Sequence, residues 1–151
     1  MAAKREAVAA ALYQTVRAGA GKVVGLKTSS RTLRAFDQVD IEEMPALFQH
    51  QKPETVERPG QLAMRKVTMH FELWLMVAPA PSDLSDLPPS AELNVAVDAI
   101  EEALAPSPVT LKNTLGNICE HCWIEGAVEY YEGLTKDGKS IAIVPVAVLV
   151  P

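Results

Sequence analysis

The sequence predicts one α+β domain over residues 1–151, in which an N-terminal helix and a second helix pack on a mixed, mostly antiparallel sheet that closes with a C-terminal β-hairpin. Three observations lead to this fold class. Apolar residues recur at helical spacing near the N-terminus and again over residues 91–104. Apolar and polar residues alternate along residues 64–77, as in a strand with one buried face. Asp137–Gly138, a hairpin turn signal, separates two further strand-like runs.

The composition is that of an ordinary globular protein, with 48% hydrophobic and 22% charged residues. A net charge of −5 is unfavourable for gripping a phosphate backbone, so we expect no sequence-specific nucleic acid partner. No run approaches the ~18 apolar residues of a membrane span, and we expect no membrane partner. The two cysteines exclude a disulfide scaffold, and a reducing compartment such as the cytoplasm is the simplest interpretation.

The first helix is predicted over residues 4–18. Its apolar residues recur every four positions, at Val8, Leu12 and Val16, and alanines fill much of the remainder. Gly19 and Gly21 are expected to end it, because glycine is common just beyond a helix C-terminus. The apolar stripe of this helix should face a core.

The next segment gives weaker signals. The run "KVVGLKT" fits a strand or a loop, and "TSSRT" is typical of a loop. A strand is predicted over residues 45–51, because its proline stands at the first position, where a missing N–H is tolerated. The following "QKPETVERPGQ" has two prolines, a glycine and mixed charge, and predicts a long solvated connection.

The clearest strand is predicted over residues 64–77. One of its faces is apolar, through Val67, Met69, Phe71, Leu73 and Leu75. The other face is polar, through Lys66, Thr68, His70 and Glu72. Trp74 and Met76 make this second face apolar near the end of the strand, which indicates that another element or another subunit covers it there.

Ser90 is the expected N-cap of a second helix over residues 91–104, which follows a proline-rich loop. The apolar stripe of this helix consists of Leu93, Val97, Ile100 and Leu104. A short third helix is predicted over residues 110–115, with Gly116 ending it.

The closing hairpin is predicted from strands over residues 122–132 and 140–150. The second strand is apolar on both faces, and Pro145 within it indicates either a sheet edge or a bulge. A long apolar edge strand invites aggregation unless it is covered, which suggests a neighbouring subunit. The candidate subunit-contact residues are therefore Trp74, Met76, Val144, Val146 and Val148.

The sequence "CEHC" places Cys119, His121 and Cys122 together as half a zinc site, a redox pair or packing residues. Structural zinc takes four ligands, and the remaining histidines are only His50 and His70. A redox pair sits at a helix N-terminus, whereas this one leads into a predicted strand, in which residues three apart point to opposite faces. We expect the thiols to diverge and to be buried packing residues without bound metal; a zinc- or thiol-dependent enzyme is the lesser alternative.

The other candidate sites are better interpreted as polar or solvated surface than as catalytic or metal-binding residues. His70 and Glu72 share a strand face, but nothing supplies a nucleophile beside them, so a polar stripe is favoured over an acid–base pair. The acids of residues 37–43 lack the spacing of a calcium-binding loop and predict a solvated turn. Five basic residues are scattered among acids, as on a solvated or interface face: Arg31, Arg34, Arg58, Arg65 and Lys66. We therefore expect no enzyme and no cofactor.

The order of elements resembles the tail terminator proteins of long-tailed bacteriophages, the group typified by the phage lambda minor tail protein U. The segments that carry the resemblance are "EEMPALFQHQKPETVE", "KVTMHFELWLMVAPAP", "LNVAVDAIEEAL" and "WIEGAVEYYEGLTKDGKSIAIVPVAVLV". The chain departs from the lambda member in its greater length, longer proline-rich linker and "CEHC".

The resemblance implies a non-enzymatic α+β subunit that forms a hexameric ring. Such a ring caps the tail tube, stops its polymerisation and offers a surface to the head. The implied partners are further copies of the chain, the tail tube protein and the head–tail connector protein. The implied location is the virion tail, assembled in the cytoplasm of the bacterial host. A head-completion or neck protein of the same virion class is the alternative.

Overall fold

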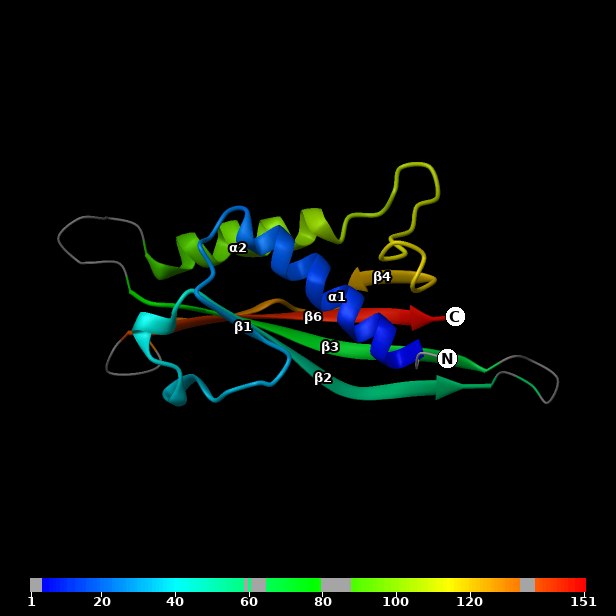
Figure 1. The fold of residues 1–151 in the computed structure, drawn as a ribbon, viewed down its shortest axis with the longest axis horizontal. Coiled ribbons are helices and arrows are strands. Elements are labelled where there is room, and N and C mark those ends of the chain that lie inside the picture. Colours follow the sequence, from blue (N-terminus) through cyan, green and yellow to red (C-terminus); the bar gives the residue numbers. More distant parts are fainter. Residues whose placement is uncertain (1–3, 59, 61–64, 80–87, 134–137) are drawn as a thin grey trace.

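The computed structural model describes residues 4–58, 60, 65–79, 88–133 and 138–151. It is a two-layer α+β domain, in which helices α1 (Lys4–Gly21) and α2 (Pro89–Ala103) lie on one face of a six-stranded sheet (Figure 1). The strand order is β1-β2-β3-β6-β4, and β5 also pairs with β6, on the same side as β4. The predicted fold class is confirmed.

Helix α1 extends to Gly21, so the prediction that it ends at Gly19 is wrong. Its buried residues include the predicted Val8, Leu12 and Val16. Gly19 faces α2, and a Cβ added there would lie 2.7 Å from the Cβ of Ala103. The glycine therefore serves the close approach of two helices and does not terminate the first one.

Strand β1 (Thr28–Ser30) pairs in parallel with the start of β2, at Thr28↔Ala46. This segment belongs to "TSSRT", so the prediction of a loop there is wrong. Two short 3₁₀ helices follow, η1 (Phe36–Gln38) and η2 (Ile41–Glu43). We call residues 33–44 the strap. The strap covers part of the sheet face opposite the helices, through Leu33, Phe36, Val39 and Met44.

Strand β2 (Ala46–Glu57) confirms the predicted strand over 45–51 and continues well beyond it. The prediction of a solvated connection from residue 51 is therefore wrong as far as Glu57. The pairing with β3 shifts register between Lys52 and Thr55, and Pro53 lies within this irregularity. A bulge tolerates the missing N–H of proline, which explains how the strand continues past it.

Strand β3 (Lys66–Val77) is the centre of the sheet and pairs antiparallel with β2 and with β6 (Ser140–Val150). Its alternation is confirmed, because the odd-numbered residues from Val67 to Val77 are buried in the main core beneath α1 and α2. At its end, Trp74 and Met76 pack in a second cluster beneath the strap. Of the two predicted covers for this end, the chain's own element is the one observed.

Helix α2 begins at Pro89, with Pro88 as its N-cap residue. Ser90 therefore lies in the first turn, and the prediction that it caps the helix is wrong; its backbone N–H donates to the Glu132 carboxylate at 3.2 Å. The predicted apolar stripe is buried: Leu93, Val97, Ile100 and Leu104.

The predicted helix over residues 110–115 is wrong, because this segment forms turns. Leu111 and Leu115 both have positive φ, at 60° and 51°, which a right-handed helix cannot contain. Asn113 holds the loop instead. Its Nδ2 donates to the carbonyls of Ala103 and Ala105 at 3.2 Å each, and its Oδ1 accepts from the Leu115 N–H at 3.0 Å.

The predicted strand over 122–132 is split into β4 (His121–Ile124) and β5 (Glu129–Tyr131). Ile124 pairs with Val146 and Glu129 with Ile143, so residues 125–128 bulge out opposite Pro145. Of the two predictions for Pro145, the bulge is confirmed and the edge is wrong, because β3 and β4/β5 flank β6. Asp137 of the predicted turn lies outside the described residues.

Candidate functional site

The two thiols of "CEHC" lie together in the main apolar core. Cys119 is 5% exposed and Cys122 is fully buried. The prediction that the thiols diverge is wrong, because Cys119 belongs to a turn before β4, after Gly116 and Asn117 with positive φ. A hydrogen bond between the thiols lowers the pKa of Cys119, and the same bond together with burial raises the pKa of Cys122. Their predicted burial is confirmed.

The ring of His121 has partners of its own. It stacks on Trp123 at a centroid distance of 5.1 Å, and its Nδ1 accepts from the Asn113 N–H at 3.1 Å. Within the described part of the chain, no three His, Cys, Asp or Glu side chains gather as they would around a metal ion. Among the described residues, the sequence motif therefore does not form a group of ligands around a metal.

The face of the sheet opposite the helices carries the second candidate, His70 and Glu72. These side chains take different partners: His70 Nε2 lies 3.2 Å from Thr55 Oγ1, whereas Glu72 Oε1 accepts from Trp74 Nε1 at 3.4 Å and lies 3.9 Å from Lys52 Nζ. This is the polar stripe that the sequence favoured over an acid–base pair.

A shallow hollow of about 280 Å³ lies beside this stripe. It lies between β2, β3 and the bulge opposite Pro145, and its polar lining consists of Lys52, His70, Glu72 and Glu125. The described residues that line it include no serine, threonine or cysteine.

The acidic segment 37–43 forms the strap's two 3₁₀ turns. Arg34 binds the Glu43 carboxylate at 3.0 Å and also donates to the Gln38 carbonyl at 2.7 Å. The Asp40 N–H donates to the same carboxylate at 3.1 Å. Hydrogen bonds from Arg34, and then from Asp40, hold the pKa of Glu43 below its ordinary value. The carboxylate therefore fixes the shape of the strap.

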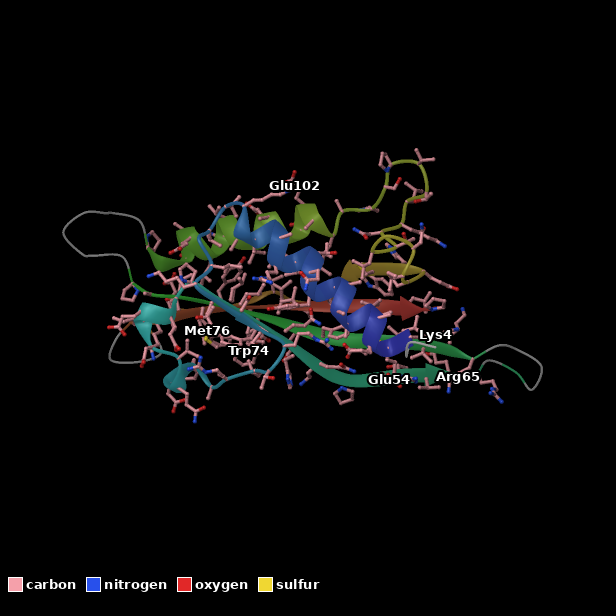
Figure 2. The ribbon with its side chains drawn as sticks, viewed as in Figure 1. Lys4, Glu54, Arg65, Trp74, Met76 and Glu102 are labelled. Atoms are coloured by element: carbon pink, nitrogen blue, oxygen red, sulfur yellow. The ribbon has the colours of Figure 1, made fainter. Side chains whose placement is uncertain are left out.

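The five residues selected as subunit contacts lie inside the subunit to different degrees. Val144, Val146 and Val148 face the helices and are at most 2% exposed. Met76 is buried beneath the strap, where Trp74 keeps part of its surface exposed; Figure 2 labels both beside the strap's turns. The reason for choosing the three valines, an uncovered edge strand, does not hold because β6 is paired on both sides.

A surface feature that the sequence did not reveal is a cationic side, formed by Arg17, Lys22 and Lys27. These exposed residues surround two adjoining hollows of about 390 and 290 Å³, which share Arg17 and Gly21. Helix α1 is tied here to the β1 edge of the sheet, where Tyr13 Oη donates to Ser29 Oγ at 2.9 Å. No described acid forms an ion pair with any of the three cations.

An anionic side, formed by Asp98, Glu101, Glu102, Glu129 and Glu132, lies over α2 and β5. All five residues are exposed, and Figure 2 shows Glu102 projecting outward from α2. Lys27 adjoins β1 and Glu129 belongs to β5, and these two strands lie at opposite edges of the sheet. The charge of the anionic side reaches Tyr130, whose pKa is raised by burial and then by Asp98 and Glu101.

The sequence alone indicates part of the anionic side. Residues 89–104 contain four acidic residues and no basic residue, so this segment carries a clear excess of negative charge. The cationic side gave no such signal, because Lys27 lies ten residues from Arg17 and joins it only through the fold.

Comparison with known proteins gives a likeness of fold. No protein-family profile and no curated protein matches the chain. A chain from a solved structure described as the virion of native gene transfer agent (GTA) particle is 17% identical, with a TM-score of 0.56 over 99% of this chain and 98% of that one. A second solved chain, whose name states no function, is 14% identical, with a TM-score of 0.54 over 97% and 95%. Identities this low show a shared fold alone.

Among the described residues, neither helix combines the length and apolar character that crossing a membrane requires.

Proposed function

We propose that this chain is a structural protein of a phage-type virion, and specifically a tail terminator. The observation that carries the proposal is the fold shared along nearly the whole chain with a protein of the gene transfer agent virion, at 99% and 98% coverage. Coverage of nearly all of both chains matters because the similarity then extends over the whole arrangement of elements and is not limited to a shared local motif.

Two further observations support a structural role over catalysis. His70 and Glu72 take different partners, and no three His, Cys, Asp or Glu side chains of the described residues gather as they would around a metal ion. The described helices and strands also follow the order by which the sequence resembles tail terminators. The zinc- or thiol-dependent alternative is less favoured, because both thiols are buried and no three His, Cys, Asp or Glu side chains of the described residues gather as they would around a metal ion.

The proposed assembly is a hexameric ring that caps the tail tube, stops its polymerisation and presents a surface to the head–tail connector protein. Its partners are further copies of this chain and the tail tube protein, and its place is the virion tail, assembled in the host cytoplasm. Separate cationic and anionic sides suit a ring, because two different surfaces on one subunit let copies join in a closed cycle.

A head-completion or neck protein is the second candidate. The printed description of the similar chain refers to a whole particle and to no component of it, so it fits either role. A neck protein would bind the portal-ring adaptor, whereas a terminator would bind the tube protein.

The decisive experiment adds the purified chain to tail tube protein of the same virus while the tube is polymerising. A terminator shortens the tubes and leaves a ring at one end, visible by negative-stain electron microscopy. Tubes of unchanged length without end rings contradict the tail terminator role. Binding to the adaptor in place of the tube assigns the chain to the neck.

A further inference from the structure

We propose that copies of this chain join head to tail, with the cationic side of one copy against the anionic side of the next. This inference rests on the proposed ring-forming function and names the surfaces that would close the ring. The cationic side comprises Arg17, Lys22 and Lys27, and the anionic side comprises Asp98, Glu101, Glu102, Glu129 and Glu132.

The positive charges of the cationic side have no ion-pair partner among the described residues of their own subunit. Two other arginines are already paired within the subunit, since Arg5 binds Glu54 at 2.7 Å and Arg31 binds Glu6 at 2.6 Å. Arg17, Lys22 and Lys27 form no such pair among the described residues. Three neighbouring cations repel one another, and an acidic surface that binds them relieves this repulsion.

The two sides also differ in shape where their surfaces are apolar. On the cationic side, Val23 is 50% exposed next to Lys22. On the anionic side, a hollow of about 470 Å³ opens between α2 and β4, with Val97, Leu104 and Ile124 in its lining and Glu101 beside them. A valine flanked by a lysine is complementary to an apolar hollow beside a carboxylate, since both groups gain a partner at once.

The charge arrangement favours head-to-tail contact over a two-fold dimer. A two-fold axis would bring each side against its own copy, so that like charges would meet. Contact between unlike sides pairs opposite charges at every junction. Because the two sides consist of different residues, each copy keeps one side open for the next until the ring closes.

Two charge-reversal variants test the contact: Arg17→Glu/Lys27→Glu on the cationic side and Asp98→Lys/Glu101→Lys on the anionic side. Each variant should assemble on the order of tenfold more weakly than the parent chain at low salt, measured by analytical ultracentrifugation. An equimolar mixture should recover assembly, because every junction of an alternating, even-membered ring again pairs opposite charges.

Matched controls carry the same charge changes elsewhere on exposed residues: Arg58→Glu/Lys66→Glu and Asp37→Lys/Glu42→Lys. They should assemble like the parent chain, and thermal melting should show that all four variants fold. Salt at about 1 M should weaken the parent assembly, since the Debye length falls to about 3 Å.

The inference is overturned if the reversal variants assemble as the parent does, if the mixture fails to recover assembly, or if the parent stays monomeric at millimolar concentration. These results leave the proposed function standing when the chain still stops tube growth. Conversely, a chain that forms charge-dependent rings without affecting tubes keeps this contact and loses the tail terminator role.

Discussion

Gly19 and Ala103 hold helices α1 and α2 at a distance that leaves no room for a side chain on the glycine. A Cβ at position 19 would lie 2.7 Å from the Ala103 Cβ and 3.3 Å from the Ala99 carbonyl oxygen. Because both near atoms sit on or next to backbone, a side chain there must push the helices apart. Helix propensity alone would favour alanine over glycine at this position.

Gly19→Ala should therefore destabilise the protein by about 1–3 kcal/mol, measured by urea unfolding. Adding Ala103→Gly should recover part of this loss, because it removes the atom that the new Cβ meets. Gly21→Ala is the matched control: nothing lies within 4 Å of a Cβ there, and the expected change is within about 0.5 kcal/mol. Equal losses for the two glycines would show that the helix contact does not set the effect.

The buried thiol pair predicts a graded response to substitution. Cys122→Ser should lower the free energy of unfolding by about 1–3 kcal/mol, because transferring a hydroxyl from water into an apolar core costs more free energy than transferring a thiol. Cys122→Ala should cost less than the serine variant, since it removes the polar group altogether. In the folded parent, both thiols should react slowly with a thiol reagent and rapidly once urea unfolds the chain. Stoichiometric zinc in the purified protein would contradict this role.

The strap should loosen in acid. Arg34 and the Asp40 N–H lower the pKa of Glu43, so the ionised carboxylate contributes stability above its unfolded pKa of about 4.3. That contribution is lost as the pH falls through the lower folded pKa. The protection of the amides in residues 33–44 against hydrogen exchange, relative to the intrinsic exchange rate at each pH, should therefore fall below about pH 4. In Glu43→Gln the exchange should already be faster at neutral pH and should respond less to acid.

Asn113 should be essential for the loop that follows α2. Asn113→Ala removes the bonds to the carbonyls of Ala103 and Ala105 and the bond from the Leu115 N–H, at an expected cost of about 1–2 kcal/mol. Hydrogen exchange should rise in residues 105–118. Asn94→Ala, an exposed position on α2, is the control and should change stability by less than about 0.5 kcal/mol. Unchanged exchange in the loop would refute the anchoring role.

The elements that could be predicted from the sequence are those in which a periodic pattern of apolar residues extends over many consecutive positions. Strand β3 and the apolar stripe of α2 follow from periodicity over many residues, and both are observed. The errors fall where a distant partner decides the local structure. The three residues of β1 form a strand because they pair with β2, and Gly19 stays helical because α2 approaches it.

The candidate site was less predictable for the same reason. Strand geometry led to diverging thiols, but the turn that contains Cys119 brings its sulfur back to Cys122. Pro145 was correctly associated with a bulge, although no local signal tells whether a neighbouring strand flanks it on the other side. The cationic side depends on where α1 rests relative to β1, which is information that only the fold contains.

The close contact at Gly19 bears on how many copies a ring contains. In a closed cyclic assembly, the angle between the two contacting surfaces of a subunit fixes the number of members. Here one of those surfaces belongs to α1 and the other to α2, and Gly19 sets the spacing between the two helices. A single methyl group at that point would thus change the angle or the distance between the two helices. In a ring built on these surfaces, it would alter the circumference before it abolished the junctions.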